Sequence, residues 1–153
     1  MIGNQPLRAA DRKAACAAES AFVLPVVLFV LFSTLDLGLA TIRYNSLADA
    51  SRRIAREAII HGSLAPAEVG SWGPASFTGT AADDSPICES IRNTLPTMSR
   101  QSVSITVTWP DADNGPRDRV IVEVTYPHQT MIPFLSSSTD IALRSSTTMN
   151  IVN

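Results

Sequence analysis

Bulky apolar residues form one long run near the N-terminus of the chain. The stretch Glu19–Ile42 reads ESAFVLPVVLFVLFSTLDLGLATI, and no charged residue occurs from Ala21 to Leu35. About 20 apolar residues, each rising about 1.5 Å in a helix, cross a hydrocarbon core of about 30 Å. A soluble protein uses a helix that is apolar on every face only when the helix is fully buried, which is the alternative here. The pattern predicts a transmembrane helix at residues 15–42.

Beyond Ile42 the apolar residues continue on one side of the helix only. Between Arg43 and Ile60 they recur with a helical period, at Leu47, Ala50, Ile54 and Ala58. Gly62 supplies a signal for the C-terminal end of a helix. We therefore expect one helix of about 40 residues, because an amphipathic extension at residues 43–61 continues the span. The apolar stripe of this extension needs a partner surface.

The middle of the chain shows little regular pattern. Ser63–Asp84 is rich in Gly, Pro, Ala, Ser and Thr, with Trp72 and Phe77 as its large side chains, and we interpret it as a loop. A short helix is predicted from Pro86 to about Leu95, with Ser85 as its N-cap.

The last third of the chain alternates apolar and polar residues, which predicts β-strands. The predicted strands are Ser102–Trp109, Arg119–Tyr126 and Asp140–Val152. Asn114-Gly115 lies between the first two and is a strong hairpin-turn signal. We expect a three-stranded antiparallel sheet whose apolar face is covered by the amphipathic helix. Residues 62–153 are thus predicted to form a small domain, and the fold class is predicted to be α+β.

Charge places limits on the function and suggests a topology. The 153 residues include 12 basic and 14 acidic side chains, a formal net charge of −2, which argues against a nucleic-acid partner. Residues 1–14 form a flexible leader that carries Arg8, Arg12 and Lys13. A basic N-terminus usually stays in the cytoplasm, so we expect a bacterial inner-membrane protein with a periplasmic C-terminal domain. Further basic residues follow Ile42, and we interpret them as a solvated helix face.

The two cysteines lie on opposite sides of the predicted span. Cys16 precedes the apolar run and Cys88 follows it, so a disulfide between them is not expected. A lipoprotein signal would place the apolar run before Cys16 rather than after it. The run is also longer than the h-region of a cleaved secretory signal.

Candidate chemistry is sparse. Cys88 and His128 could be drawn as a nucleophile and base with Arg144 as a third member. The favoured interpretation is that Cys88 is a small packed residue and that His128 lies in a loop. The acidic stretch Asp111–Gly115 departs from the spacing of a calcium loop and favours a hairpin turn. No catalytic residue, metal site or cofactor is predicted.

Two carboxylates lie in or beside the apolar run. Glu19 stands at its entrance and Asp36 lies in its far half. An ionised side chain in hydrocarbon costs a few kcal/mol, so intramembrane acids usually have a compensating partner. Asp36 is accordingly predicted as an intramembrane polar residue. The simpler alternative for both is a place in the headgroup zone, where a charge costs little.

The order of residues around Glu19 resembles the N-terminus of type IV pilin-like proteins, and more narrowly the TadE-like family of tight-adherence (Flp-type) pilus assembly. Residues 17–25, AAESAFVLP, resemble the A-x-E-F-A-L-V-L-P run of that family, with Ser20 in place of the aromatic residue. Asp36-Leu37-Gly38 resembles the acidic-aromatic-glycine step that ends its apolar helix. Ser46–Glu57 resembles its alanine-rich continuation. The C-terminal layout, including Pro133-Phe134, is similar in outline.

The resemblance implies a minor pseudopilin that is cut by a prepilin peptidase between Ala14 and Ala15, although Ala14 stands where the pilin consensus has glycine. It implies that Glu19 sets the register of stacked subunits by pairing with an α-ammonium group. In an uncleaved chain, Arg12 or Lys13 would have to supply that charge. The expected partners are other pilin-like subunits, the pilus assembly platform, the peptidase and the lipid bilayer. The alternative function is a membrane-tethered binding or scaffold domain unrelated to pili.

Overall fold

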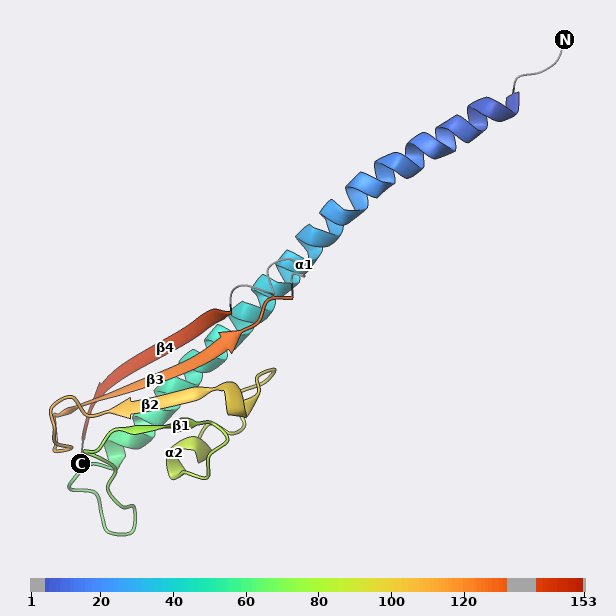
Figure 1. Ribbon diagram of the computed structural model, residues 1–153. Coiled ribbons are helices and arrows are strands. Elements are labelled where there is room, and N and C mark those ends of the chain that lie inside the picture. The colour runs from blue at the N-terminus through green and yellow to red at the C-terminus, as the bar shows by residue number, and fades with distance from the viewer. Residues whose placement is uncertain (1–4, 132–139, 153) are drawn as a thin grey trace.

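The computed structural model describes residues 5–131 and 140–152, with side chains from Arg12 onward. A single long helix carries a small antiparallel sheet along its C-terminal half, and its N-terminal half projects away from the sheet (Figure 1). The elements in chain order are α1 (Gln5–Ile60), β1 (Phe77–Thr80), α2 (Pro86–Glu89), the 3-10 turn η1 (Arg100–Ser102), β2 (Ser104–Thr108), β3 (Arg119–His128) and β4 (Ile141–Asn150). The predicted α+β class is confirmed.

The helix α1 has 56 residues and is longer than predicted. It begins at Gln5, so the prediction of a flexible leader was wrong for residues 5–13. Alanine dominates residues 9–18, and alanine is the residue with the highest helix propensity. Pro25 lies inside the helix, which remains continuous through it. The helix ends two residues before Gly62, as the stop signal predicted.

The sheet has four strands in the order β1-β2-β3-β4, and all neighbours pair antiparallel. The prediction of three strands missed β1, which lies inside the segment interpreted as a loop. Phe77 of β1 pairs with Val107 of β2, and Thr80 pairs with Ser104. The sequence FTGT has too few apolar positions to show a period of two, so only the pairing with β2 reveals the strand.

The predicted hairpin between β2 and β3 is confirmed, but its turn differs. The backbone takes positive φ at Ala112 (60°) and Arg117 (79°), and Gly115 is not among the positive-φ residues described. Asn114 is instead buried, and its side-chain nitrogen donates to Ser71 Oγ (2.8 Å) and to the Trp72 carbonyl (2.7 Å). The asparagine therefore anchors the loop before β1 rather than forming a two-residue turn.

The core lies between the second half of α1 and one face of the sheet, as predicted. The helix contributes buried side chains at Leu47, Ala50, Ile54, Ala55 and Ala58, and the sheet contributes Ile105, Val107, Val120, Val122 and Val124. Burial alternates strictly along the first eight residues of β3, so one face of the strand meets the helix and the other is partly exposed.

The helix α2 is shorter than predicted and ends at Glu89. Two hydroxyls after it bond to nearby carbonyls: Ser90 Oγ donates to Ile87 (3.2 Å) and Thr94 Oγ1 donates to Ile91 (2.8 Å). Such local bonds compete with helix continuation. Ile87, Cys88 and Ile91 are nevertheless buried, so the segment packs on the core without extending the helix.

Candidate membrane and assembly interface

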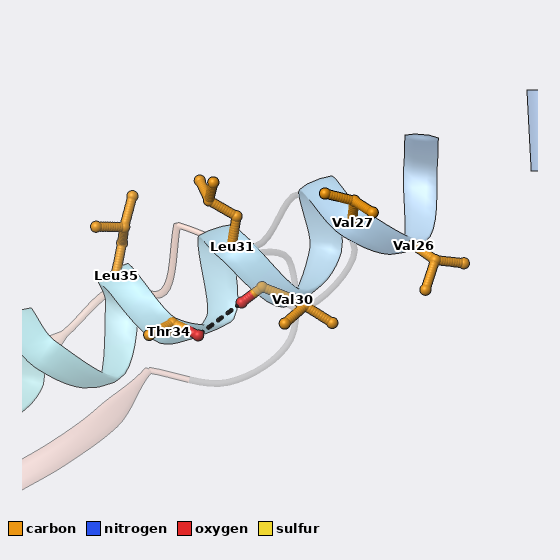
Figure 2. Close-up of a pocket in the computed structure, with 6 residues that line it drawn as sticks. All are labelled: Val26, Val27, Val30, Leu31, Thr34 and Leu35. Carbon is orange, nitrogen blue, oxygen red and sulfur yellow. Dashed lines mark hydrogen bonds between the residues drawn. The ribbon is translucent and has the colours of Figure 1, made fainter. Parts of the chain in front are cut away.

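The first half of α1 is exposed, and we call residues 12–35 the bare segment. Every described side chain from Arg12 to Leu35 is exposed except Ser33, which is half-buried. This part of the helix is long and apolar enough to cross a membrane. Figure 2 shows valine and leucine side chains projecting outward from successive turns; the residues drawn are Val26, Val27, Val30, Leu31, Thr34 and Leu35. A surface of this kind suits lipid tails or neighbouring apolar helices.

The hydroxyl side chains of this segment are satisfied within the helix. Thr34 Oγ1 donates to the Val30 carbonyl at 2.8 Å, which is the dashed line in Figure 2. The same i−4 pattern holds for Ser20, Ser33, Thr41 and Ser46, which donate at 2.7 to 3.1 Å. A hydroxyl without a partner in hydrocarbon would be costly, so this pattern makes the helix compatible with lipid on all sides.

The residues predicted for processing and register lie near the start of the exposed segment. Ala14, Ala15 and Glu19 are all exposed and helical. Glu19 lines a shallow groove on the helix surface with Ser20, Val23, Leu24 and Val27. Among the side chains that the structure describes, no cation forms an ion pair with Glu19. The carboxylate is therefore available to a group from another molecule.

Asp36 is the first buried side chain of α1 and has partners in the C-terminal domain. Its side chain accepts a hydrogen bond from the Met131 backbone N–H, at 3.1 Å from Oδ1. The same oxygen lies 3.3 Å from His128 Nε2. The direction of this second contact is poor for a hydrogen bond, so it is a close electrostatic contact. Asp36 thus fastens the helix to the end of β3.

Arg43, two turns after Asp36, completes this arrangement. Its Nη1 lies 2.7 Å from His128 Nδ1, and its Nη2 donates to the Thr97 carbonyl at 3.0 Å. Its guanidinium carbon lies 5.3 Å from the centre of the Tyr126 ring. A guanidinium can only donate, so Nδ1 of His128 accepts and the imidazole proton resides on Nε2, facing Asp36. We call Asp36, Arg43 and His128 the junction triad.

Sequence reasoning missed the junction triad for two reasons. His128 was predicted to lie in a loop, but β3 continues to His128, which is fully buried. The signal was present in the sequence, since the alternation of Val120, Val122, Val124 and Tyr126 reaches His128 in phase. Arg43 was assigned to a solvated face, and this assignment was wrong because its side chain turns toward the sheet.

The structure does not join the three residues considered as a thiol site. Cys88 is buried and its Sγ donates to the Thr80 carbonyl at 3.3 Å. Burial, reinforced by the charge of Asp83, raises the pKa of the Cys88 thiol, and Arg92 opposes this in part. Arg144 pairs with Glu123, whereas the ring nitrogens of His128 face α1. These contacts leave Cys88 as a packed, protonated thiol.

The acidic loop between β2 and β3 is occupied by internal bonds. Asp111 pairs with the Arg119 side chain and accepts from its backbone N–H at 2.9 Å, which lowers the pKa of Asp111 to about 2. Asp118 accepts from the Gly115 N–H at 2.9 Å. Within residues 5–131 and 140–152, no group of three or more His, Cys, Asp or Glu side chains is arranged to hold a metal. The carboxylates of this loop therefore stabilise the turn of the β2–β3 hairpin.

Comparison with known proteins adds one result. Residues 15–56 match the family model described as TadE-like protein, and the matched stretch lies wholly within α1. No curated protein and no solved structure matches the chain. The matched stretch contains Glu19, the bare apolar span and two members of the junction triad, Asp36 and Arg43. The match confirms the predicted resemblance to the TadE-like family over residues 15–56.

Proposed function

We propose that this chain is a minor pilin-like subunit, a pseudopilin, that takes part in assembling, priming or anchoring a tight-adherence (Flp-type, type IV-related) pilus. The observation that carries the proposal is the coincidence of the TadE-like match with the bare apolar helix. In the same chain, contacts of the junction triad join that helix to a small α+β domain. An anchor continuous with a compact domain is the arrangement expected of a subunit that stacks through its helix.

We propose that Glu19 lies within the membrane, and the length of the bare segment supports this. The C-terminal domain packs on α1 from Asp36 onward, so the hydrocarbon segment ends near Leu35. About 20 helical residues are needed to span about 30 Å, which takes the segment back to Cys16. We therefore place the span at residues 16–35, seven residues short of the expected end at Ile42. Glu19 then lies within its first turn.

A carboxylate at this depth needs a partner from outside the chain. A single buried charge in a low-dielectric surrounding is unfavourable, and pairing with an opposite charge offsets the desolvation. The α-ammonium group that cleavage before Ala15 would create is such a partner when a second subunit stacks alongside. In an uncleaved chain, Arg12 or Lys13 of a neighbour takes this place. Glu19 thereby sets the axial register between subunits.

Substitution of Glu19 tests the proposal. We expect Glu19→Ala to abolish piliation while the protein still fractionates with the inner membrane, because insertion depends on the apolar span and stacking depends on the charge. The measurement is pilus counting by electron microscopy beside membrane fractionation. Glu68→Ala removes an exposed acid of the C-terminal domain and serves as the matched control. Unchanged piliation in Glu19→Ala would contradict the pseudopilin role and favour a tethered binding or scaffold domain.

Processing is tested separately. Intact-mass measurement of the purified protein should give a chain that begins at Ala15. Ala14→Gly restores the glycine of the pilin consensus before the cut, and it should increase the processed fraction. A chain that retains Met1 in cells with an active prepilin peptidase would refute cleavage, and it would leave the membrane anchor unaffected.

A further inference from the structure

Exposed apolar side chains gather at the end of the C-terminal domain that faces the membrane. We call the following residues the collar: Leu37 (70% exposed), Ile42 (54%), Met131 (57%) and Ile141 (46%). Leu37 and Ile42 lie on α1 directly after the bare span, whereas Met131 follows β3 and Ile141 begins β4. Nothing in the described part of the chain covers these side chains.

Contacts place the sheet residues of the collar at the level where the helix leaves the span. The Met131 N–H donates to Asp36, so the Met131 backbone lies beside the first buried residue of α1. Ile141 pairs across the sheet with His128, which contacts both Asp36 and Arg43. The collar residues from α1 and from the β3–β4 end therefore lie within about two turns of one another along the helix axis.

We infer that the collar seats the C-terminal domain in the headgroup and upper acyl region of the same membrane that α1 crosses. This rests on the proposed single span. The interfacial zone adds about 5–8 Å to each side of the hydrocarbon core. Leu37 lies about 3 Å beyond Leu35, and Ile42 lies about 10 Å beyond it with a side chain that leans back toward the N-terminus. Both side chains can reach the zone.

The polar residues beside the collar are suited to the headgroup region of a membrane and not to its hydrocarbon core. Gln129 and Asp140 are exposed next to the sheet residues of the collar, and a charge is tolerated among headgroups but costly deeper. Tyr44 is 48% exposed on α1 two residues beyond Ile42, and tyrosine is enriched where membrane meets water. A mixture of apolar, aromatic and acidic side chains over about two helical turns is typical of shallow insertion.

Exposed apolar residues at the other end of the domain provide an internal control. Leu64 (69% exposed) follows the C-terminal end of α1. Asp36 and Ile60 are separated by 24 helical residues, or about 36 Å. Leu64 is therefore too far from the span to reach the same interface while the domain stands upright on the helix.

Site-specific fluorescence tests the inference on the full chain in phospholipid vesicles. Cys16→Ser removes the exposed native thiol, and Cys88 is buried and should not take up dye. An environment-sensitive fluorophore is then attached at Met131→Cys, Ile141→Cys, Leu31→Cys or Leu64→Cys, one at a time. Vesicles contain lipids with a spin label either near the headgroup or near the end of the acyl chain. Each label therefore reports whether its position contacts lipid and at what depth.

We expect labels at Met131→Cys and Ile141→Cys to show blue-shifted emission and to be quenched more by the shallow spin label than by the deep one. The label at Leu31→Cys should be quenched more by the deep label, and the label at Leu64→Cys should be quenched by neither. Quenching at Leu31→Cys without quenching at either collar position would overturn the inference and leave the span intact. Absence of quenching at Leu31→Cys as well would instead reject the span, and with it the proposed function.

Two other outcomes would also overturn the inference. Equal quenching at Leu64→Cys and Met131→Cys would mean that the domain adsorbs to lipid without orientation. In the second outcome, the collar labels show blue-shifted emission but are not quenched by the spin-labelled lipids, and energy transfer between copies rises with protein density. This result would assign the collar to a contact between subunits.

Discussion

Asp36 accepts one hydrogen bond from the C-terminal domain and makes one close electrostatic contact with it. The carboxylate receives the Met131 N–H and faces Nε2 of His128, which is fully buried. Arg43 binds the other nitrogen of the same imidazole. The imidazole therefore lies between a donor and an anion; removal of Arg43 leaves Nδ1 without a donor, and removal of the Asp36 carboxylate leaves the Met131 N–H without an acceptor.

Substitution of Asp36 should destabilise the domain. Asp36→Ala leaves the Met131 N–H without an acceptor and removes the carboxylate that faces His128 Nε2, and a buried unsatisfied group costs about 1–3 kcal/mol. The measurement is urea unfolding in detergent micelles, followed by tryptophan fluorescence. Asp49→Ala is the control, because its exposed ion pair with Arg53 contributes only about 0.3–0.5 kcal/mol. Equal losses in the two variants would show that the triad adds no stability.

Gly73 lies at a position that only glycine fits. Its φ is +84°, and a Cβ there would come within 2.6 Å of Trp109 Cε2. We expect Gly73→Ala to cost about 1–2 kcal/mol for the backbone conformation and about 1–3 kcal/mol more for the clash. Gly70→Ala shares the positive φ (+77°) but meets nothing within 4 Å, so urea unfolding of both variants isolates the clash. A Gly73→Ala variant as stable as Gly70→Ala would mean that Trp109 moves aside freely.

The Asp111–Arg119 pair predicts a pH dependence. Because the folded-state pKa of Asp111 is about 2 and the unfolded value is about 3.9, the pair stabilises the fold above about pH 4. That contribution disappears as the pH falls through about 2. Asp111→Asn should therefore lower the unfolding midpoint near pH 6 and converge with the parent protein as the pH falls below about 2. Arg119→Gln should produce the same loss, and the double variant should lose no more than either one.

At the scale of elements, a buried hydroxyl cluster joins α1 to β4. Ser51 is fully buried, and its Oγ lies 2.8 Å from Thr147 Oγ1 and 3.2 Å from Ser145 Oγ. The strand β4 carries serine and threonine where β3 carries valine, so polar contacts replace part of the apolar packing at this edge of the sheet.

Removal of the Ser51 hydroxyl should loosen the contact between α1 and β4. We expect Ser51→Ala to cost about 1–3 kcal/mol of unfolding free energy, because Ser145 and Thr147 lose a buried partner. Ser51→Ala combined with Thr147→Val should cost less than the sum of the single changes. Ser46→Ala is the control, since that hydroxyl bonds only to its own helix in the described structure. Hydrogen exchange of the β4 amides gives a second readout, and unchanged protection would argue against the cluster.

At the scale of the whole molecule, the bare half of α1 adds almost nothing to the core. Side chains from Arg12 to Leu35 are exposed apart from half-buried Ser33. A chain that starts at Leu35 should therefore fold as a water-soluble domain with the unfolding free energy of the full chain in micelles, to within about 0.5 kcal/mol. Circular dichroism and urea unfolding would measure this. An unfolded fragment would show that the span or the membrane supports the domain.

Several features of the fold could be predicted from local patterns. The apolar run, the one-sided stripe of Leu47 and Ile54, and the alternation in β2 and β3 each follow from side-chain periodicity. The strand β1 could not be predicted this way, because four residues with one large apolar side chain carry no period. The role of Asn114 was also hidden, since its partners Ser71 and Trp72 are more than forty positions away.

The sequence by itself determined that the chain has a helix long and apolar enough to span a membrane, an amphipathic continuation and an antiparallel sheet, because each depends on the residue pattern within one segment. It also carried the TadE-like resemblance of residues 15–56, which depends on residue order. Only the tertiary structure decided where the exposed apolar part of α1 ends and which groups Asp36 contacts. Both depend on Asp36 meeting Met131 and His128, more than ninety positions away in the chain, and local pattern cannot encode such distant contacts.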